Sequence, residues 1–133
     1  MEPLIINNKN TKFLKILFDK DENTFIINGN SLPENATLFF TPVHEWLSEY
    51  KLQANSESIL HLYLNYYNTS SSKHLLKIFF HFKDIMTRGN KVLVKWYGSE
   101  EADYVEEAEI YQSLVDIPFE FIEEVPDFSK FFK

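Results

Sequence analysis

The chain of 133 residues has no cysteine, a formal net charge of −7, 44% hydrophobic and 17% aromatic residues, and three glycines. This length and composition fit one domain with a well-filled core, whereas the acidic balance argues against nucleic acid or an anionic membrane surface as a partner, because both require basic patches. No apolar run approaches the ~20 residues that cross a bilayer, so we expect residues 1–133 to form a single domain without a membrane segment.

The first elements predicted along the chain are strands. Two apolar runs, residues 13–18 and 24–29, flank the polar segment 19–23, and this arrangement predicts a β-hairpin. Residues 4–6 are compatible with one more short strand before the hairpin. The chain is therefore expected to open with antiparallel strands.

A helix is predicted after the segment Ser31-Leu32-Pro33-Glu34-Asn35. Its apolar face is marked by residues at helical spacing, namely Val43, Trp46, Leu47 and Tyr50. Thr41 followed by Pro42 predicts the start of the regular helix, with Thr41 as N-cap, because proline fits the first helical position. Residues 36–40 are compatible with one preceding turn.

The central part of the chain predicts a strand that leads directly into a long helix. Residues 59–66 alternate between apolar and polar positions, which is the period of a half-buried strand. Over residues 70–88 apolar residues recur at helical spacing until a Gly-Asn pair stops the pattern. Asn68, Thr69 or Ser70 is then the N-cap of this helix, because all three residue types are favoured at that position.

The last third of the chain predicts a strand over residues 91–97, a helix and a final strand over residues 118–122. The helix is lined by apolar and aromatic residues, namely Tyr104, Ala108, Tyr111 and Val115. The resulting order β-β-α-β-α-β-α-β predicts an α/β (α+β) fold, in which a mixed sheet with an N-terminal hairpin carries about three helices. Three phenylalanines in the tail, residues 125–133, are expected to cover part of the core, with contact to a partner as the alternative.

The hydroxyl-rich segment 68–72 is the strongest functional signal. The first backbone N–H groups of a helix lack internal partners and carry the positive end of the helix dipole. A phosphoryl group on a cap or first-turn hydroxyl is therefore electrostatically favoured, and it would add ~−1.5 to −2 charges to this surface. The structural alternative is that these residues serve only as helix caps.

Little in the chain supports an enzyme. It has no cysteine nucleophile, no glycine-rich phosphate loop and no cluster of metal ligands, so we expect no cofactor and no bound metal. Ser70 and His74 lie four residues apart, which is the minimum for the nucleophile and base of a small hydrolase or ligand-binding protein. No acid or oxyanion element accompanies them, and a surface histidine on an amphipathic helix is the simpler interpretation.

Two further observations concern location and partners. The chain starts without the basic-then-apolar pattern of a secretion signal and has no cysteine, so we expect a cytoplasmic protein. Acidic residues concentrate between residues 100 and 124. They predict a solvated helix face and strand end, with a docking surface for a basic partner as the alternative.

Four segments resemble the SiaC family of bacterial regulatory phosphoproteins. They are Ser31-Leu32-Pro33-Glu34-Asn35 ahead of a helix, Tyr66-Tyr67-Asn68-Thr69-Ser70-Ser71 at the strand-to-helix junction, Trp96-Tyr97 at the end of the next strand, and Pro118-Phe119-Glu120-Phe121. The resemblance is collinear over about residues 10–124, which would make residues 125–133 a C-terminal extension. The Asn-Thr-Ser-Ser and Pro-Glu-Asn segments are its most specific parts.

This resemblance implies a fold similar to the anti-sigma-factor antagonists (STAS domains) and a non-enzymatic role in partner switching. It implies that Thr69, the threonine of the Asn-Thr-Ser-Ser segment, is phosphorylated by a serine/threonine kinase with a histidine-kinase-like ATPase fold. A PP2C-type phosphatase is expected to reverse the modification. The unmodified protein is expected to bind and stimulate a diguanylate cyclase, which the phosphorylated protein releases.

The residues expected to contact partners surround the modification site. They are Pro33, Glu34, Asn35, Tyr67, Asn68, Ser70 and Ser71. Unmodified Thr69 is expected to cap the helix, and its phosphate to weaken docking. The chain departs from the family pattern at Gly98, where an aromatic residue is usual, and at Ala108-Glu109, where a Gly-Glu pair is usual, and both departures bear on the identity of the partner. A constitutive interaction scaffold is the alternative interpretation.

Overall fold

The computed structural model describes residues 1–7, 14–31, 35–98 and 104–132. Six strands form one sheet in the order β1-β2-β3-β4-β5-β6. The strands are β1 (Leu4–Ile6), β2 (Lys15–Asp19), β3 (Thr24–Ser31), β4 (Glu57–Tyr67), β5 (Lys91–Tyr97) and β6 (Phe119–Ile122). The helices are α1 (Ala36–Tyr50), α2 (Thr69–Thr87) and α3 (Tyr104–Val115), with short 3-10 helices η1 (Lys51–Gln53) and η2 (Phe128–Phe132).

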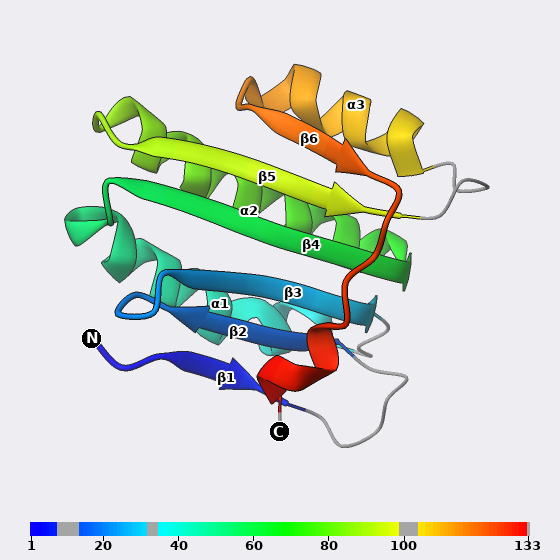
Figure 1. Cartoon of the computed structure of the whole chain (residues 1–133), viewed down its shortest axis with the longest axis horizontal. Coiled ribbons are helices and arrows are strands. Elements are labelled where there is room, and N and C mark those ends of the chain that lie inside the picture. The colour runs from blue at the N-terminus through cyan, green and yellow to red at the C-terminus, as the bar shows by residue number, and fades with distance from the viewer. Residues whose placement is uncertain (8–13, 32–34, 99–103, 133) are drawn as a thin grey trace.

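The sheet is mixed. β1, β2 and β3 pair antiparallel, whereas β3, β4, β5 and β6 pair parallel. The three α-helices connect the parallel strands and cover one face of the sheet, while η2 lies against the other face (Figure 1). The predicted mixed sheet with an N-terminal hairpin and three helices is confirmed.

This topology determines where the functional segment lies. The carboxyl ends of parallel strands meet at one edge of a sheet, and the crossover helices begin there. β3 and β4 end side by side, because Ser31 pairs with Tyr67 in the parallel register. α1 and α2 therefore start as neighbours at this edge, which brings Asn35 to the same end of the molecule as Thr69.

The main core fills the space between the sheet and the helices. Its sheet side consists of alternate strand residues, such as Leu60 and Leu62 of β4, and its helix side consists of apolar stripes such as Ile78 and Phe82 of α2. Phe25 of β3 lies at its centre and is fully buried. The alternation in the strands and the helical spacing in α2 are the patterns that predicted these elements.

The start of α1 differs from the prediction. The helix begins at Ala36, and Asn35 is its N-cap, because the Asn35 side chain accepts a hydrogen bond of 3.0 Å from the backbone N–H of Leu38. Thr41 is inside the helix, where its hydroxyl donates to the Thr37 carbonyl at 2.6 Å, and Pro42 follows it. The predicted cap at Thr41 was therefore wrong. Burial of Ala36 and Phe40 in the core stabilises the first turns, which compensates for the N–H that proline lacks.

The tail covers the face of the sheet that the α-helices leave open. Phe128 and Phe132 are buried with Ile26 and Tyr97 in a second, smaller cluster. The Asn7 side chain donates to the Phe132 carbonyl at 2.7 Å, which ties the tail to the N-terminal segment. Phe131, the third phenylalanine, is exposed, so two of the three tail phenylalanines are buried as expected. In the described part of the chain, no helix combines the length and the apolar character that membrane crossing requires.

Candidate functional site

The junction between β4 and α2 places Thr69 at the first position of a long helix. Asn68 has an extended backbone, and its side-chain oxygen accepts from the Ser71 backbone N–H at 2.9 Å and from the Ser70 hydroxyl at 3.0 Å. Asn68 is therefore the N-cap among the three residues that the sequence allowed. The expectation that unmodified Thr69 caps the helix was wrong.

The corrected cap changes what modification of Thr69 would do to the helix. Because the capping acceptor is the Asn68 side chain, which bonds the Ser71 backbone N–H, a phosphate on Thr69 would not remove the cap. Thr69 and Ser70 are exposed, whereas Ser71 is 2% exposed. Thr69 and Ser70 are thus accessible to another protein, while Ser71 is part of the packed interior.

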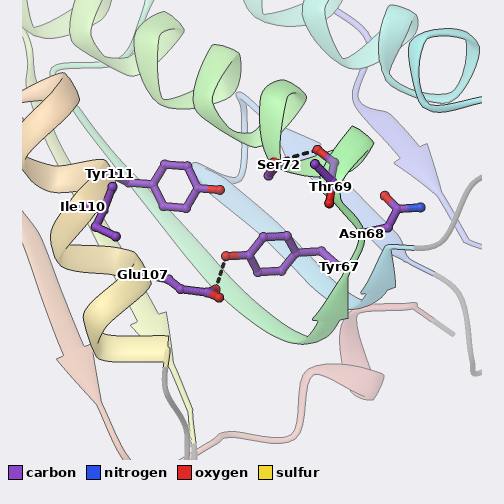
Figure 2. A pocket seen from close by; sticks show the side chains of 7 residues that line it. All are labelled: Tyr67, Asn68, Thr69, Ser72, Glu107, Ile110 and Tyr111. Carbon is purple, nitrogen blue, oxygen red and sulfur yellow. Dashed lines mark hydrogen bonds between the residues drawn. The ribbon is translucent and has the colours of Figure 1, made fainter.

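A cavity of about 330 Å³ lies directly beside Thr69 (Figure 2). It is lined by residues from the β4–α2 junction and from α3, namely Tyr67, Asn68, Thr69, Ser72, Glu107, Ile110 and Tyr111. The Tyr67 hydroxyl donates a hydrogen bond to the Glu107 carboxylate across this cavity. The structure thereby joins the predicted modification site to α3, which the sequence interpretation had not connected with it.

Two tyrosines give the cavity aromatic walls. Burial, with the hydrogen bond to Glu107 as a further cause, raises the pKa of Tyr67 well above its usual value, so its hydroxyl remains a donor. Burial likewise raises the pKa of Tyr111. The Tyr111 ring stacks on Trp96 and meets Phe79 edge-on, at centroid distances of 6.0 Å and 5.3 Å. These contacts hold α3 against the core, and the cavity is therefore a feature of the packed domain.

Apart from the buried Ser71, the other predicted contact residues lie at the junction, at the start of α1 or outside the described residues. Tyr67, Asn68 and Ser70 surround Thr69 at the junction, and Asn35 begins the neighbouring helix α1 at the same edge of the sheet. Pro33 and Glu34 lie outside the described residues. The structure therefore gathers the described candidates at one end of the molecule, and their role in binding stays a prediction.

The proposed pair of Ser70 and His74 is not assembled. The Ser70 hydroxyl donates to Asn68, whereas His74 contacts His44 through Nδ1 at 3.0 Å and Thr37 through Nε2 at 3.5 Å. His74 is 7% exposed, so the expectation of a surface histidine was wrong. This geometry provides no support for a nucleophile and its base at these positions.

His74 instead belongs to a row of three histidines between α1 and α2. His44 lies between the other two. Its Nε2 is 3.0 Å from Nδ1 of His74, and its Nδ1 is 3.3 Å from Nε2 of His81. His74 and His81 are two helical turns apart on α2, and this spacing indicates that they share one face of the helix. The sequence pattern of α2 could not show that their partner on α1 is His44. Among the described residues, no group of three or more histidine, aspartate or glutamate side chains is placed to hold a metal ion.

Comparison with known proteins gives a family and a fold. The sequence profile of the SiaC family regulatory phosphoproteins matches residues 7–124, and no curated protein matches. The crystal structure of apo-SiaC from Pseudomonas aeruginosa is similar with a TM-score of 0.82 and 25% identity, over 92% of this chain and 99% of that chain. SiaC in complex with the diguanylate cyclase SiaD, which it activates, is similar with a TM-score of 0.78 and 26% identity, over 90% and 98% of the two chains.

Proposed function

Because this chain belongs to the SiaC family of regulatory phosphoproteins, we propose that it is a non-enzymatic switch protein whose binding activity is controlled by reversible phosphorylation of Thr69. The observation that carries the proposal is the position of Thr69. This residue is exposed, it is the first residue of α2, it lines a cavity, and the capping function is performed by its neighbour Asn68.

The unmodified protein binds and stimulates a target, which we propose is a diguanylate cyclase. Support comes from the solved complex in which SiaC of Pseudomonas aeruginosa is the activator of the cyclase SiaD, and this chain covers 98% of the chain it matches there. The surface around Thr69 offers the partner a cavity with two aromatic walls. In such a concave, partly apolar site, the exclusion of water contributes most to binding affinity.

Phosphorylation would act on this surface through local electrostatics. A phosphate at the start of α2 is close to the first backbone N–H groups of the helix and to the positive end of the helix dipole, so the modified helix remains stable. The same group brings ~−1.5 to −2 charges and a strong hydration shell to the edge of the cavity. A partner that must bury this edge then has to displace that water, and its affinity falls.

The proposal requires two enzymes that act on Thr69. A serine/threonine kinase with a histidine-kinase-like ATPase fold adds the phosphate, and a PP2C-type phosphatase removes it. Exposure of Thr69 at the first helical position is compatible with access by both enzymes. Genes for such a kinase, phosphatase or cyclase beside the gene for this chain would support the assignment.

The first test maps the modification on the endogenous protein. Intact mass followed by phosphopeptide sequencing across residues 60–80 is expected to show partial phosphate on Thr69, under at least one growth or stress condition. The exposed neighbour Ser70 is the internal control for site selectivity. Absence of phosphate from Thr69 in all conditions would contradict the switch and would favour a constitutive interaction scaffold.

A further inference from the structure

The outer face of α3 carries two large apolar side chains that are open to solvent. Ile110 is 60% exposed and Leu114 is 58% exposed. Residues four apart lie on the same side of a helix, so the two side chains form one stripe, which we call the α3 stripe. Ile110 also lines the cavity beside Thr69, so the α3 stripe continues directly from that cavity.

The margin of the α3 stripe is acidic. Glu106, Glu107 and Glu109 are exposed on the same helix, and α3 contains no lysine or arginine. The ion pairs found among the described residues join Lys51 to Asp84 and Lys83 to Asp116, and neither uses a glutamate of α3. An apolar stripe whose acidic margin has no ion-pair partner in the described part of the chain is complementary to an apolar segment flanked by lysine or arginine.

We propose that the α3 stripe and the adjoining cavity are the surface on which the target cyclase docks, through an apolar segment with basic flanks. One apolar side chain of that segment occupies the cavity between Tyr67 and Tyr111. This inference rests on the proposed function and identifies the contact surface used by the switch. It places docking on the α3 side of Thr69, whereas the sequence had predicted contacts that extend toward Asn35 and the start of α1.

The location explains why phosphate on Thr69 would release the partner. The basic flank of the partner and the phosphate attract each other, but an exposed ion pair improves affinity by no more than roughly five-fold. Filling the cavity would strip water from a phosphate dianion at the edge of a cavity that the Glu107 carboxylate also lines, and such desolvation lowers affinity by roughly two powers of ten or more. The desolvation effect is the larger one, so phosphorylation weakens docking.

The test compares exposed apolar side chains on different faces of the molecule. The double variant Ile110→Ser/Leu114→Ser removes the α3 stripe, and Leu38→Ser probes the α1 side, where Leu38 is 72% exposed. Leu52→Ser is the matched control, because Leu52 is 66% exposed in η1, at the end of α1 opposite to Asn35. Each purified, unphosphorylated protein is titrated against the purified diguanylate cyclases encoded in the same genome.

We expect wild type, Leu38→Ser and Leu52→Ser to bind one cyclase with equal affinity, and the double variant to bind it roughly ten-fold or more weakly. Thermal unfolding of all four proteins should coincide within a few degrees, because every changed side chain is exposed.

A second double variant, Glu106→Gln/Glu109→Gln, removes two charges from the acidic margin. It should slow association with the cyclase and reduce the dependence of the association rate on salt.

The results that would overturn the inference are distinct from those that would overturn the function. If the α3 double variant binds like wild type, or if Leu38→Ser is the variant that binds weakly, docking occurs elsewhere and the phosphorylation switch is unaffected. If wild type binds no cyclase from its own genome, the proposed target is wrong and the docking surface proposed for it is wrong as well.

Discussion

Acidification from pH 7 to pH 4 is expected to lower the free energy of unfolding by roughly 2–4 kcal/mol, through the three histidines between α1 and α2. Burial lowers the pKa of His44 to about 4, with the nearby His81, His74 and Lys77 acting in the same direction. Burial also lowers the pKa of His81 to about 4, where Lys51 adds to the effect and Asp84 opposes it. The pKa of His74 is lowered by burial and by Lys77.

The hydrogen-bond pattern explains why these imidazoles stay neutral. His44 contacts a ring nitrogen of a histidine on each side, and a neutral ring offers one donor and one acceptor, as such a row requires. The Nδ1 atom of His81 is buried and has no hydrogen-bond partner in the described part of the chain. A proton added there would be a buried donor without an acceptor, which is costly.

The sign of the pH effect follows from the two states. Above pH 7 the histidines are neutral in both the folded and the unfolded chain, so they do not make the free energy of unfolding depend on pH there. Between the ordinary pKa of 6.5 and the folded pKa of about 4, the unfolded chain binds protons that the folded chain does not bind, so the free energy of unfolding falls as the pH falls. Each site could contribute about 1.4 kcal/mol per pH unit, and partial solvent access reduces the total to the range stated above.

Urea denaturation followed by tryptophan fluorescence at pH 7.5, 6.5, 5.5 and 4.5 measures this effect. The variant His81→Asn should lower stability at pH 7.5, because it breaks the row, and should flatten the profile below pH 6.5, because one shifted site is gone. A wild-type profile that is flat between pH 7 and pH 4.5 would contradict the account. So would a His81→Asn profile as steep as that of wild type.

The substitution Phe25→Ala is expected to cost roughly 3–5 kcal/mol of unfolding free energy, the usual range for removal of a buried phenylalanine. Phe25 is fully buried, and its ring contacts four other aromatic rings, namely Phe18, Trp46, Tyr50 and Phe82. These rings come from β2, α1 and α2, so a cavity at this point cannot close without moving several elements.

Chemical denaturation of Phe25→Ala and of Phe80→Ala provides the matched comparison. Phe80 is on α2 and is 45% exposed, so the same chemical change should cost about 1 kcal/mol or less there. Equal losses in the two variants would show that the described packing around Phe25 is wrong. Because Phe25 is remote from the Thr69 surface, its variant should bind the partner normally at temperatures where it remains folded.

The sheet and its helices were predictable because the chain carries strong periodic patterns. The alternation before Tyr67 and the helical spacing after Ser70 identify β4 and α2, and the junction between them follows. The choice of cap was not predictable, because Asn68, Thr69 and Ser70 all suit an N-cap and the backbone geometry of the junction decides among them. The N-cap of α1 was predicted wrongly at Thr41, because Pro42 fits a first helical position. The preceding turn over residues 36–40, which the sequence allowed, is helical, and its packing extends the helix.

The part of the candidate site that the sequence did not predict comes from α3, far along the chain from Thr69. Glu107, Ile110 and Tyr111 are about 40 residues after Thr69, and no local pattern connects the two segments. Only the parallel pairing of β4 with β5 and of β5 with β6 brings α3 beside the start of α2. The histidine row has the same origin, because His44 meets His74 and His81 through the packing of α1 on α2. Contacts of this kind depend on tertiary structure and cannot be read from spacing.

The most direct test of the central claim is the affinity of two forms of the protein for the same cyclase. Calorimetric titration should compare the unmodified chain with a chain phosphorylated completely on Thr69, and with Thr69→Ala treated with the same kinase. We expect the phosphorylated chain to bind roughly 100-fold or more weakly than the unmodified chain, and Thr69→Ala to bind like the unmodified chain before and after treatment. Equal affinity of the phosphorylated and unmodified chains would contradict the account.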